Sequence, residues 1–443
     1  MLSALFAVCF IAIILTPSRA SACVTIIAGK DRTRSGSIIH AHLEDMGVDA
    51  VGKVWRTEAA SHAPGATVAV PYESVPVPEK TFGYWATGNA DDAEGLGINT
   101  LRMPYNNILA GFNDNAVIMS CNWCYSREEN SPESGLRRYA LRQLVLEQAE
   151  GARHGVELLG SWMDRYGQAD WGGLQFQLSD ANEAWIVEVT SRRWVARKLA
   201  DDEIFVMANR FTIGEQYDMG SHDLVAFAVA NGWHDRTAPF HFADAYTLPQ
   251  RRNSPYDTER ERRMLSMLSA GGKIEIRDIL AVFQDRYEGT ELFVIPDDSI
   301  QIWEEEAEKN NRPRPICTNL AQSFFAATHG GGTAENRFAF FLGLGTPGYS
   351  GIFPLYPESA QICPSYFVED GETPLAWRVF REIQRRTDKD FQRLSNKVKQ
   401  YWEQHNLAVL ERVFTMEAAD KNALTLEESR ENLVRARAIL EDL

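Results

Sequence analysis

The stretch Ala20-Ser21-Ala22-Cys23-Val24-Thr25-Ile26-Ile27-Ala28-Gly29 decides how this 443-residue chain is interpreted. Its first three residues have the small-x-small pattern of a signal-peptidase site, and residues 2–15, LSALFAVCFIAIIL, form an apolar run before it. That run is shorter than the roughly 20 residues a membrane span needs. We therefore predict that residues 1–22 are a signal peptide, with a retained signal anchor as the alternative.

Cleavage after Ala22 would make Cys23 the first residue of the mature chain. A terminal cysteine carries a thiol beside an α-amine whose reference pKa is about 7.7–8.0, so one residue can supply both nucleophile and base. This is the chemistry of N-terminal nucleophile hydrolases. A structural cysteine and a lipidated lipoprotein cysteine are the alternatives. The β-branched run that begins at Val24 differs from the polar tether of a lipoprotein, and so favours the nucleophile.

The next segment predicts a β-hairpin. Residues 29–36, GKDRTRSG, have turn composition, and residues 37–45, SIIHAHLED, have strand composition. An antiparallel hairpin would return Asp45 toward Cys23, where its carboxylate could hold the terminal amine. Capping of a turn is the alternative role for Asp45.

Five cysteines would remain after cleavage: Cys23, Cys121, Cys124, Cys317 and Cys363. An exported chain with an odd count has one thiol left over, which is Cys23 if the other four form disulfides. Three pairings of those four are open. A redox role for the Cys121–Cys124 CxxC is a weaker alternative, and a zinc site weaker still, because there is no second CxxC.

Composition excludes several classes of function. The chain has 45 basic and 61 acidic residues, a net charge of −16, which disfavours binding to nucleic acid. Its 11 Trp, 14 Tyr and 22 Phe supply a large core. No Walker loop, dinucleotide-binding GxGxxG, HExxH or EF-hand loop occurs, so we predict neither a cofactor nor a metal.

Several blocks resemble peptidase family C69, the cysteine dipeptidases related to secernins and, more distantly, to penicillin V acylases and bile salt hydrolases. The blocks follow in order along nearly the whole predicted mature chain: CVTIIAGK at 23–30, SGSII at 35–39, EDMG at 44–47, GFNDNAV at 111–117, paired helices in 136–167, SDANEAWIVEVTS at 179–191, ANRF at 208–211, and a late strand pair in 338–356.

The resemblance implies roles for matching residues. Cys23 would be the nucleophile, and Asp45 would orient its amine. Asn209 would donate its side-chain amide to the oxyanion; an Asn in a left-handed turn is the alternative. A backbone N–H near Asn122 would be a second donor.

Two positions depart from the family pattern. His42 stands where the family usually has Arg, and Arg210 stands where it usually has Gln. A titratable imidazole does not replace a fixed cation. We therefore expect Arg210 to supply the substrate-binding cation and His42 to be a neutral packing residue.

The pattern of elements favours an α+β fold. Residues 136–146 and 154–166 have helical spacing, and residues 174–178, 183–190, 194–199 and 204–208 have strand composition. Residues 48–110, which contain Pro71, Pro76 and Pro78, are expected to be turn-rich and irregular. The resemblance implies a four-layer αββα sandwich with two antiparallel sheets. We predict one domain at 23–373 with a helical extension of that domain at 374–443.

The resulting functional prediction is an exported cysteine dipeptidase, located outside the cell, in the periplasm or in the endo-lysosomal system. Its partners would be dipeptides or small peptides, with no nucleic acid and no membrane anchor after cleavage; a homo-oligomer is compatible with the sequence. The alternatives are an acylase acting on non-peptide amides and a non-catalytic, secernin-like binding protein, for which His42 is the best argument.

Overall fold

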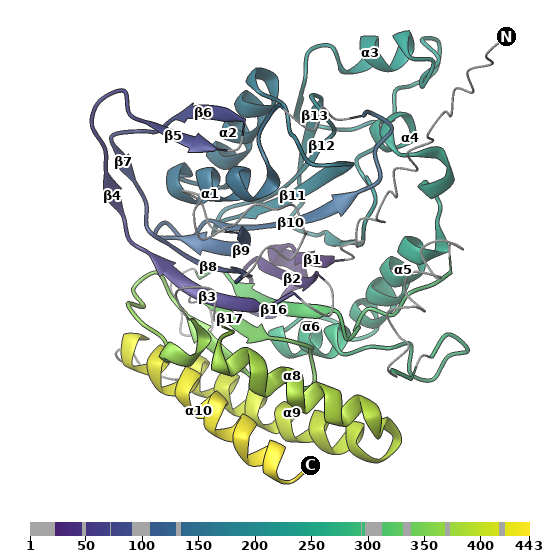
Figure 1. Cartoon of the computed structure of the whole chain (residues 1–443). Helices are drawn as coiled ribbons and strands as arrows, with labels where there is room; N and C mark the ends of the chain where they lie inside the picture. Colours follow the sequence, from purple (N-terminus) through teal and green to yellow (C-terminus); the bar gives the residue numbers. More distant parts are fainter. Residues whose placement is uncertain are drawn as a thin grey trace, which may run out of the picture.

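The computed structural model describes residues 23–46, 50–70, 72–90, 107–129, 134–293, 295–296, 312–330, 338–367, 373–415 and 421–443. The predicted signal peptide, residues 1–22, lies outside the described residues. Two antiparallel sheets lie face to face, with helices on the outer face of each (Figure 1). The α+β fold with two antiparallel sheets, predicted from the sequence, is confirmed.

The first sheet contains the segment that opens the predicted mature chain. Its six strands have the order β14-β1-β2-β16-β17-β18, and every neighbouring pair is antiparallel. β1 and β2 form the predicted hairpin and occupy central positions. The bounds are β1 Val24–Ala28, β2 Ile39–Asp45, β14 Ile204–Met207, β16 Ala321–Thr328, β17 Ala339–Leu344 and β18 Ile352–Leu355.

The second sheet has eight strands in the order β15-β13-β12-β11-β10-β9-β8-β3, again antiparallel. The bounds are β3 Gly52–Thr57, β8 Tyr84–Asn89, β9 Asn107–Asn113, β10 Ile118–Cys124, β11 Gly173–Ser179, β12 Ala184–Val189, β13 Trp194–Lys198 and β15 Met219–Gly220. Two small two-stranded sheets, β4 Ala60–Ser61 with β7 Lys80–Thr81 and β5 Thr67–Val70 with β6 Glu73–Pro76, lie beside it.

The expectation that residues 48–110 are irregular is wrong for the described part of that range. Seven strands, β3 to β9, lie there. Pro76, one of the prolines that suggested a loop, is the last residue of β6. The runs between them, such as Tyr84-Trp85-Ala86, are aromatic and buried, which is the composition of a strand that packs on both faces.

Helices cover both outer faces. α1 Arg138–Gln148 and α2 Ala152–Arg165 pack on the second sheet, while α5 Pro255–Ser269 and α6 Ile276–Phe283 pack on the first. α8 Leu375–Lys389, α9 Phe391–Thr415 and α10 Lys421–Glu441 lie against β17 and β18 and occupy the predicted extension at 374–443 (Figure 1). The short helices α3 Leu224–Ala230 and α4 Phe242–Tyr246 close the end near β13. None of the described helices has both the length and the apolar composition required to cross a membrane.

The layer between the sheets is apolar at both ends and polar in the middle. One apolar cluster joins Phe325 and Phe340 of the first sheet to Phe112 of the second, and another joins Ile27 to Ile186. Between them, side chains of β1 and β2 hydrogen-bond to side chains of β10 and β11. Buried polar groups are retained where they are hydrogen-bonded, so this strip indicates a functional region rather than packing alone.

Candidate active site

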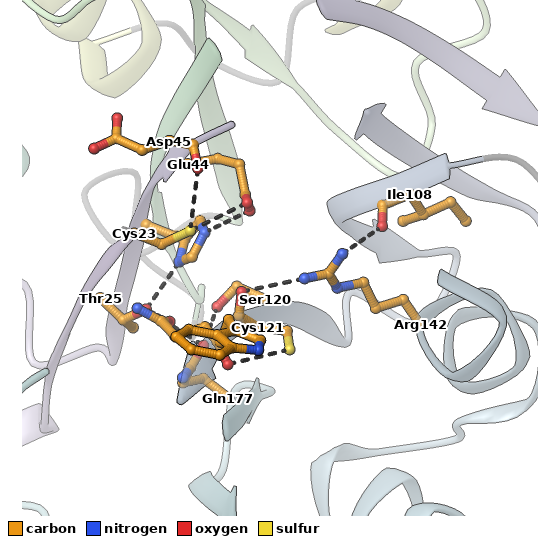
Figure 2. A network of polar contacts seen from close by, with 12 residues as sticks. Cys23, Thr25, Glu44, Asp45, Ile108, Ser120, Cys121, Arg142 and Gln177 are labelled. Carbon is orange, nitrogen blue, oxygen red and sulfur yellow. Dashed lines mark hydrogen bonds and ion pairs between the residues drawn. The ribbon is translucent and has the colours of Figure 1, made fainter. Parts of the chain in front are cut away.

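Cys23 lies immediately before β1, and the β1–β2 register determines what faces its thiol. Thr25 pairs with His42 and Val24 with Leu43, so Cys23 lies opposite Glu44. Because side chains alternate along a strand, Cys23, His42 and Glu44 share the inner face of the sheet. The Cys23 Sγ lies 3.1 Å from Glu44 Oε1, and both residues are buried (Figure 2).

His42 connects this pair to the second sheet. Its Nε2 lies 3.0 Å from Glu44 Oε2, and its Nδ1 lies 2.8 Å from Thr25 Oγ1. The Thr25 hydroxyl donates to Asn122 Oδ1 at 2.7 Å and is 3.3 Å from Gln177 Oε1. Both of those atoms are acceptors, so Thr25 must accept from His42, and Nδ1 carries a hydrogen.

The Glu44 carboxylate is held in its ionised form. Burial alone would raise its pKa, but the His42 hydrogen bond and charge, the charge of Arg142 and the Cys23 hydrogen bond together leave the pKa below its usual value. Arg142, on α1, is buried and is anchored by hydrogen bonds to the carbonyls of Ile108, at 2.8 Å, and Cys121, at 3.2 Å.

Asp45 points to the opposite face of the strand. Figure 2 shows its carboxylate turned away from the Cys23 thiol, although its backbone carbonyl lies 4.0 Å from that sulfur. Its Oδ2 lies 3.0 Å from Arg314 Nη2 and accepts from Thr318 Oγ1 at 3.2 Å. Its Oδ1 is buried and has no hydrogen-bond partner among the described residues. Burial raises the pKa of Asp45 despite Arg314 and Arg260, so a further donor near Oδ1 would favour the charged form.

Asn209 is fixed by a buried cation that sequence reasoning missed. Arg260, on α5 and fully buried, donates to Asn209 Oδ1 at 3.1 Å and to Asp257 Oδ1 at 2.7 Å. The same guanidinium lies 3.5 Å from the Cys23 carbonyl. With its oxygen held by Arg260, the Asn209 amide directs its nitrogen the other way, and Nδ2 donates to the Trp123 carbonyl at 2.9 Å.

The two departures from the family pattern, His42 and Arg210, have different surroundings. Arg210 is bound through Nε, at 2.8 Å, and Nη2, at 2.5 Å, to Glu261 Oε2 on α5. His42 is part of the polar network described above and is not a packing residue. Among the described residues, the buried Arg260 lies near the Cys23 carbonyl, the buried Arg314 pairs with Asp45, and the charge of the buried Arg142 acts on Glu44.

The five described cysteines form no disulfide. Cys121 and Cys124 are three residues apart on β10, so they face opposite sides of the sheet and belong to different apolar clusters. Burial raises the pKa of Cys121 to about 12 and that of Cys317 to about 11. The inference that Cys23 is the leftover thiol assumed disulfides among the other four cysteines, and the structure has none among these residues.

The strand register could have identified Glu44. Thr25 and Cys23 are two apart, as are His42 and Glu44, so the predicted hairpin already places Glu44 on the face of the thiol. The Sγ, imidazole nitrogen and carboxylate oxygen of Cys23, His42 and Glu44 lie within 4.8 Å of one another, which is a metal-ligand arrangement that no sequence spacing signalled. Arg260 and Arg314 come from distant segments and had no local signal.

A family model and individual relatives both connect this sequence with peptidases. The model of peptidase family C69 matches residues 22–404. A probable dipeptidase of Latilactobacillus sakei is 27% identical over 304 residues, 61% of this chain and 62% of that protein. A dipeptidase of Bifidobacterium longum is 26% identical over 284 residues, 56% of this chain and 51% of that protein. The alignments thus span about half to three-fifths of these relatives.

Among solved structures, a penicillin V acylase from Agrobacterium tumefaciens matches 75% of this chain and 85% of its own, with 16% identity and a TM-score of 0.39. A conjugated bile acid hydrolase from Clostridium perfringens matches 75% of this chain and 92% of its own, with 12% identity and a TM-score of 0.39.

Proposed function

This chain belongs to peptidase family C69, and from that premise we propose that it is an exported cysteine dipeptidase whose nucleophile is the thiol of an N-terminal Cys23. The observation that carries the proposal is the buried contact of 3.1 Å between Cys23 Sγ and Glu44 Oε1, where Cys23 immediately precedes the inner strand β1. A cysteine with only a packing role would not require a buried carboxylate beside its sulfur.

Removal of residues 1–22 would generate the α-amine at Cys23. The buried Asp45 Oδ1, which has no partner among the described residues, supports a place for that amine. Asp45 would then accept a hydrogen bond from the amine, and Glu44 would orient the thiol of the same residue. Glu44 and Asp45 both lie on β2, next to the strand that follows Cys23, so the sheet fixes both carboxylates relative to that residue.

In the reaction, the α-amine takes the thiol proton and the sulfur attacks the carbonyl carbon of the peptide bond. The Asn209 amide, oriented by Arg260, would stabilise the resulting oxyanion. Return of the proton to the leaving nitrogen breaks the C–N bond and leaves a thioester on Cys23. Water then attacks the thioester, which releases the acid and restores the thiol.

Hydrolysis of a dipeptide panel by the purified protein tests this proposal. Cys23→Ala should abolish hydrolysis without loss of fold, and Cys23→Ser should leave only a residual rate. Cys317→Ala is the matched control, because it removes another buried thiol whose raised pKa keeps it protonated. Turnover by folded Cys23→Ala at the wild-type rate would contradict the mechanism. Hydrolysis of N-acyl amides but not of dipeptides would favour the acylase alternative.

A further inference from the structure

The three side chains Cys23, His42 and Glu44 have a property that the peptidase reaction does not use. Their donor atoms lie within 4.8 Å of one another, and all three residues are at most 2% exposed. The Sγ–Oε1 and Nε2–Oε2 separations are 3.1 and 3.0 Å. Ligand atoms on a tetrahedral zinc ion, with bond lengths of about 2.0–2.3 Å, are about 3.5 Å apart, so small side-chain adjustments would make these atoms ligands.

We propose that these three side chains, together with the α-amine of Cys23, form a site for a borderline-soft divalent cation such as Zn²⁺, and that occupancy of this site blocks the nucleophile. The proposal rests on the proposed function, because only a processed chain has the amine. Amine and thiolate of one cysteine close a five-membered chelate ring, and the imidazole and carboxylate complete four donors. Sulfur and nitrogen ligands favour Zn²⁺ over Mg²⁺ or Ca²⁺.

The surroundings of His42 are already arranged as a metal site requires. Metal-binding histidines donate their second ring N–H to a neighbour, which fixes the ring. Here Nδ1 donates to Thr25 Oγ1 at 2.8 Å, and Thr25 is held in turn by Asn122, whose own Nδ2 is fixed by the Ala208 carbonyl at 3.0 Å. Nε2 is thereby directed toward Glu44 and the thiol.

The charges also match. The thiolate and carboxylate carry two negative charges, which a divalent ion neutralises in a buried site. Binding displaces the thiol proton and the proton that Nε2 shares with Glu44, and bonds from the metal to sulfur, nitrogen and oxygen replace the two hydrogen bonds. The ion and the substrate carbonyl would compete for the same sulfur, so metal binding is inhibitory. The arginine that the family usually has at position 42 could not bind the ion, whereas the imidazole of His42 can.

Titration of the purified, processed chain with Co²⁺ tests the site without reference to turnover. We expect one Co²⁺ per chain and a near-ultraviolet thiolate-to-cobalt charge-transfer band, with Zn²⁺ displacing the cobalt and excess Ca²⁺ failing to do so. His42→Gln and Glu44→Gln should each weaken Co²⁺ affinity at least tenfold. His405→Gln, a buried histidine on α9, is the control and should bind as wild type does.

Wild-type protein that shows no thiolate–cobalt band, or His42→Gln protein that binds as tightly as wild type, would overturn the metal site. The wild-type spectrum decides the matter even if a variant does not fold. Failure of the site is distinguishable from failure of the proposed function. If the chain hydrolyses dipeptides but shows no thiolate–cobalt band, only the proposed metal site is contradicted. If the chain binds cobalt through Cys23 but hydrolyses no dipeptide, the proposed function is contradicted, and so is the inhibitory role of the metal ion.

Discussion

Replacement of Arg260 by glutamine should damage both the fold and the site. The guanidinium is fully buried and donates to Asp257, to Asn209 and, at 3.0 Å, to the Tyr256 carbonyl. Asp257 is equally buried, and its pKa is raised by burial in spite of the compensating charge of Arg260. Arg260→Gln would leave Asp257 with its backbone hydrogen bond from Asn209 at 3.2 Å and with more distant cations.

The expected cost follows from the uncompensated carboxylate. Removal of one partner of a buried ion pair typically destabilises a protein by about 3–5 kcal/mol, and Arg260→Gln should lower the free energy of unfolding by that amount. Asp257→Asn combined with Arg260→Gln should recover part of the loss, since no charge is then left unpaired. The kcat should also fall, because the Asn209 amide loses the donor that orients it.

Chemical denaturation of wild type and variants measures these effects, with steady-state kinetics on the same samples. Arg262→Gln is the matched control on the same helix: Arg262 is exposed and pairs with Glu259, so its loss should leave stability unchanged. If Arg260→Gln lowers the free energy of unfolding by less than about 1 kcal/mol, the reasoning about this buried pair is refuted.

Three further predictions concern single residues. Asn209→Ala should lower kcat about a hundredfold with little change in KM, because an oxyanion donor acts mainly in the transition state; an unchanged kcat would remove it from the site. Arg210→Gln should lower the melting temperature, because Glu261 loses its ion-pair partner and keeps, among the described residues, only the hydrogen bond from the Ala208 N–H, while kcat/KM changes less than threefold; a tenfold loss would restore Arg210 as the substrate cation. The pKa of buried His329 is lowered by burial to about 4 from an ordinary 6.5, so its contribution to stability is present above pH 6.5 and is lost as pH falls toward 4. That contribution is about 3 kcal/mol, and His329→Gln should flatten this part of the stability–pH curve; an unaltered slope would contradict it.

Local sequence signals predicted the elements that hold Cys23. The β1–β2 hairpin, α1, α2 and strands β11 to β14 lie within a few residues of their predicted places, because turn composition and apolar spacing are local properties. The strands within residues 52–89 were not predicted, because the prolines in this segment indicated loops and the short aromatic runs were not recognised as strands. The fold could therefore be predicted where patterns were regular, and less well where short strands alternate with turns.

The site was predictable only in part, for a geometric reason. Cys23 and Asp45 come from the hairpin, and Glu44 could have been added from the strand register. Arg260 and Arg314 approach the same point from segments more than 200 residues away in the chain, and only the packing of α5 and the segment before β16 brings them there. The partner of Arg210 was likewise unpredictable, because Glu261 lies on another element.

The central claim is that the chain acts through an N-terminal Cys23. The most direct test is N-terminal sequencing and intact mass of the active protein, before and after alkylation by a thiol reagent that abolishes hydrolysis. The account predicts a chain that begins at Cys23 and carries a single adduct on that residue when inactivated. Full activity in a chain that still carries residues 1–22, or a lipid on the Cys23 thiol, would contradict it.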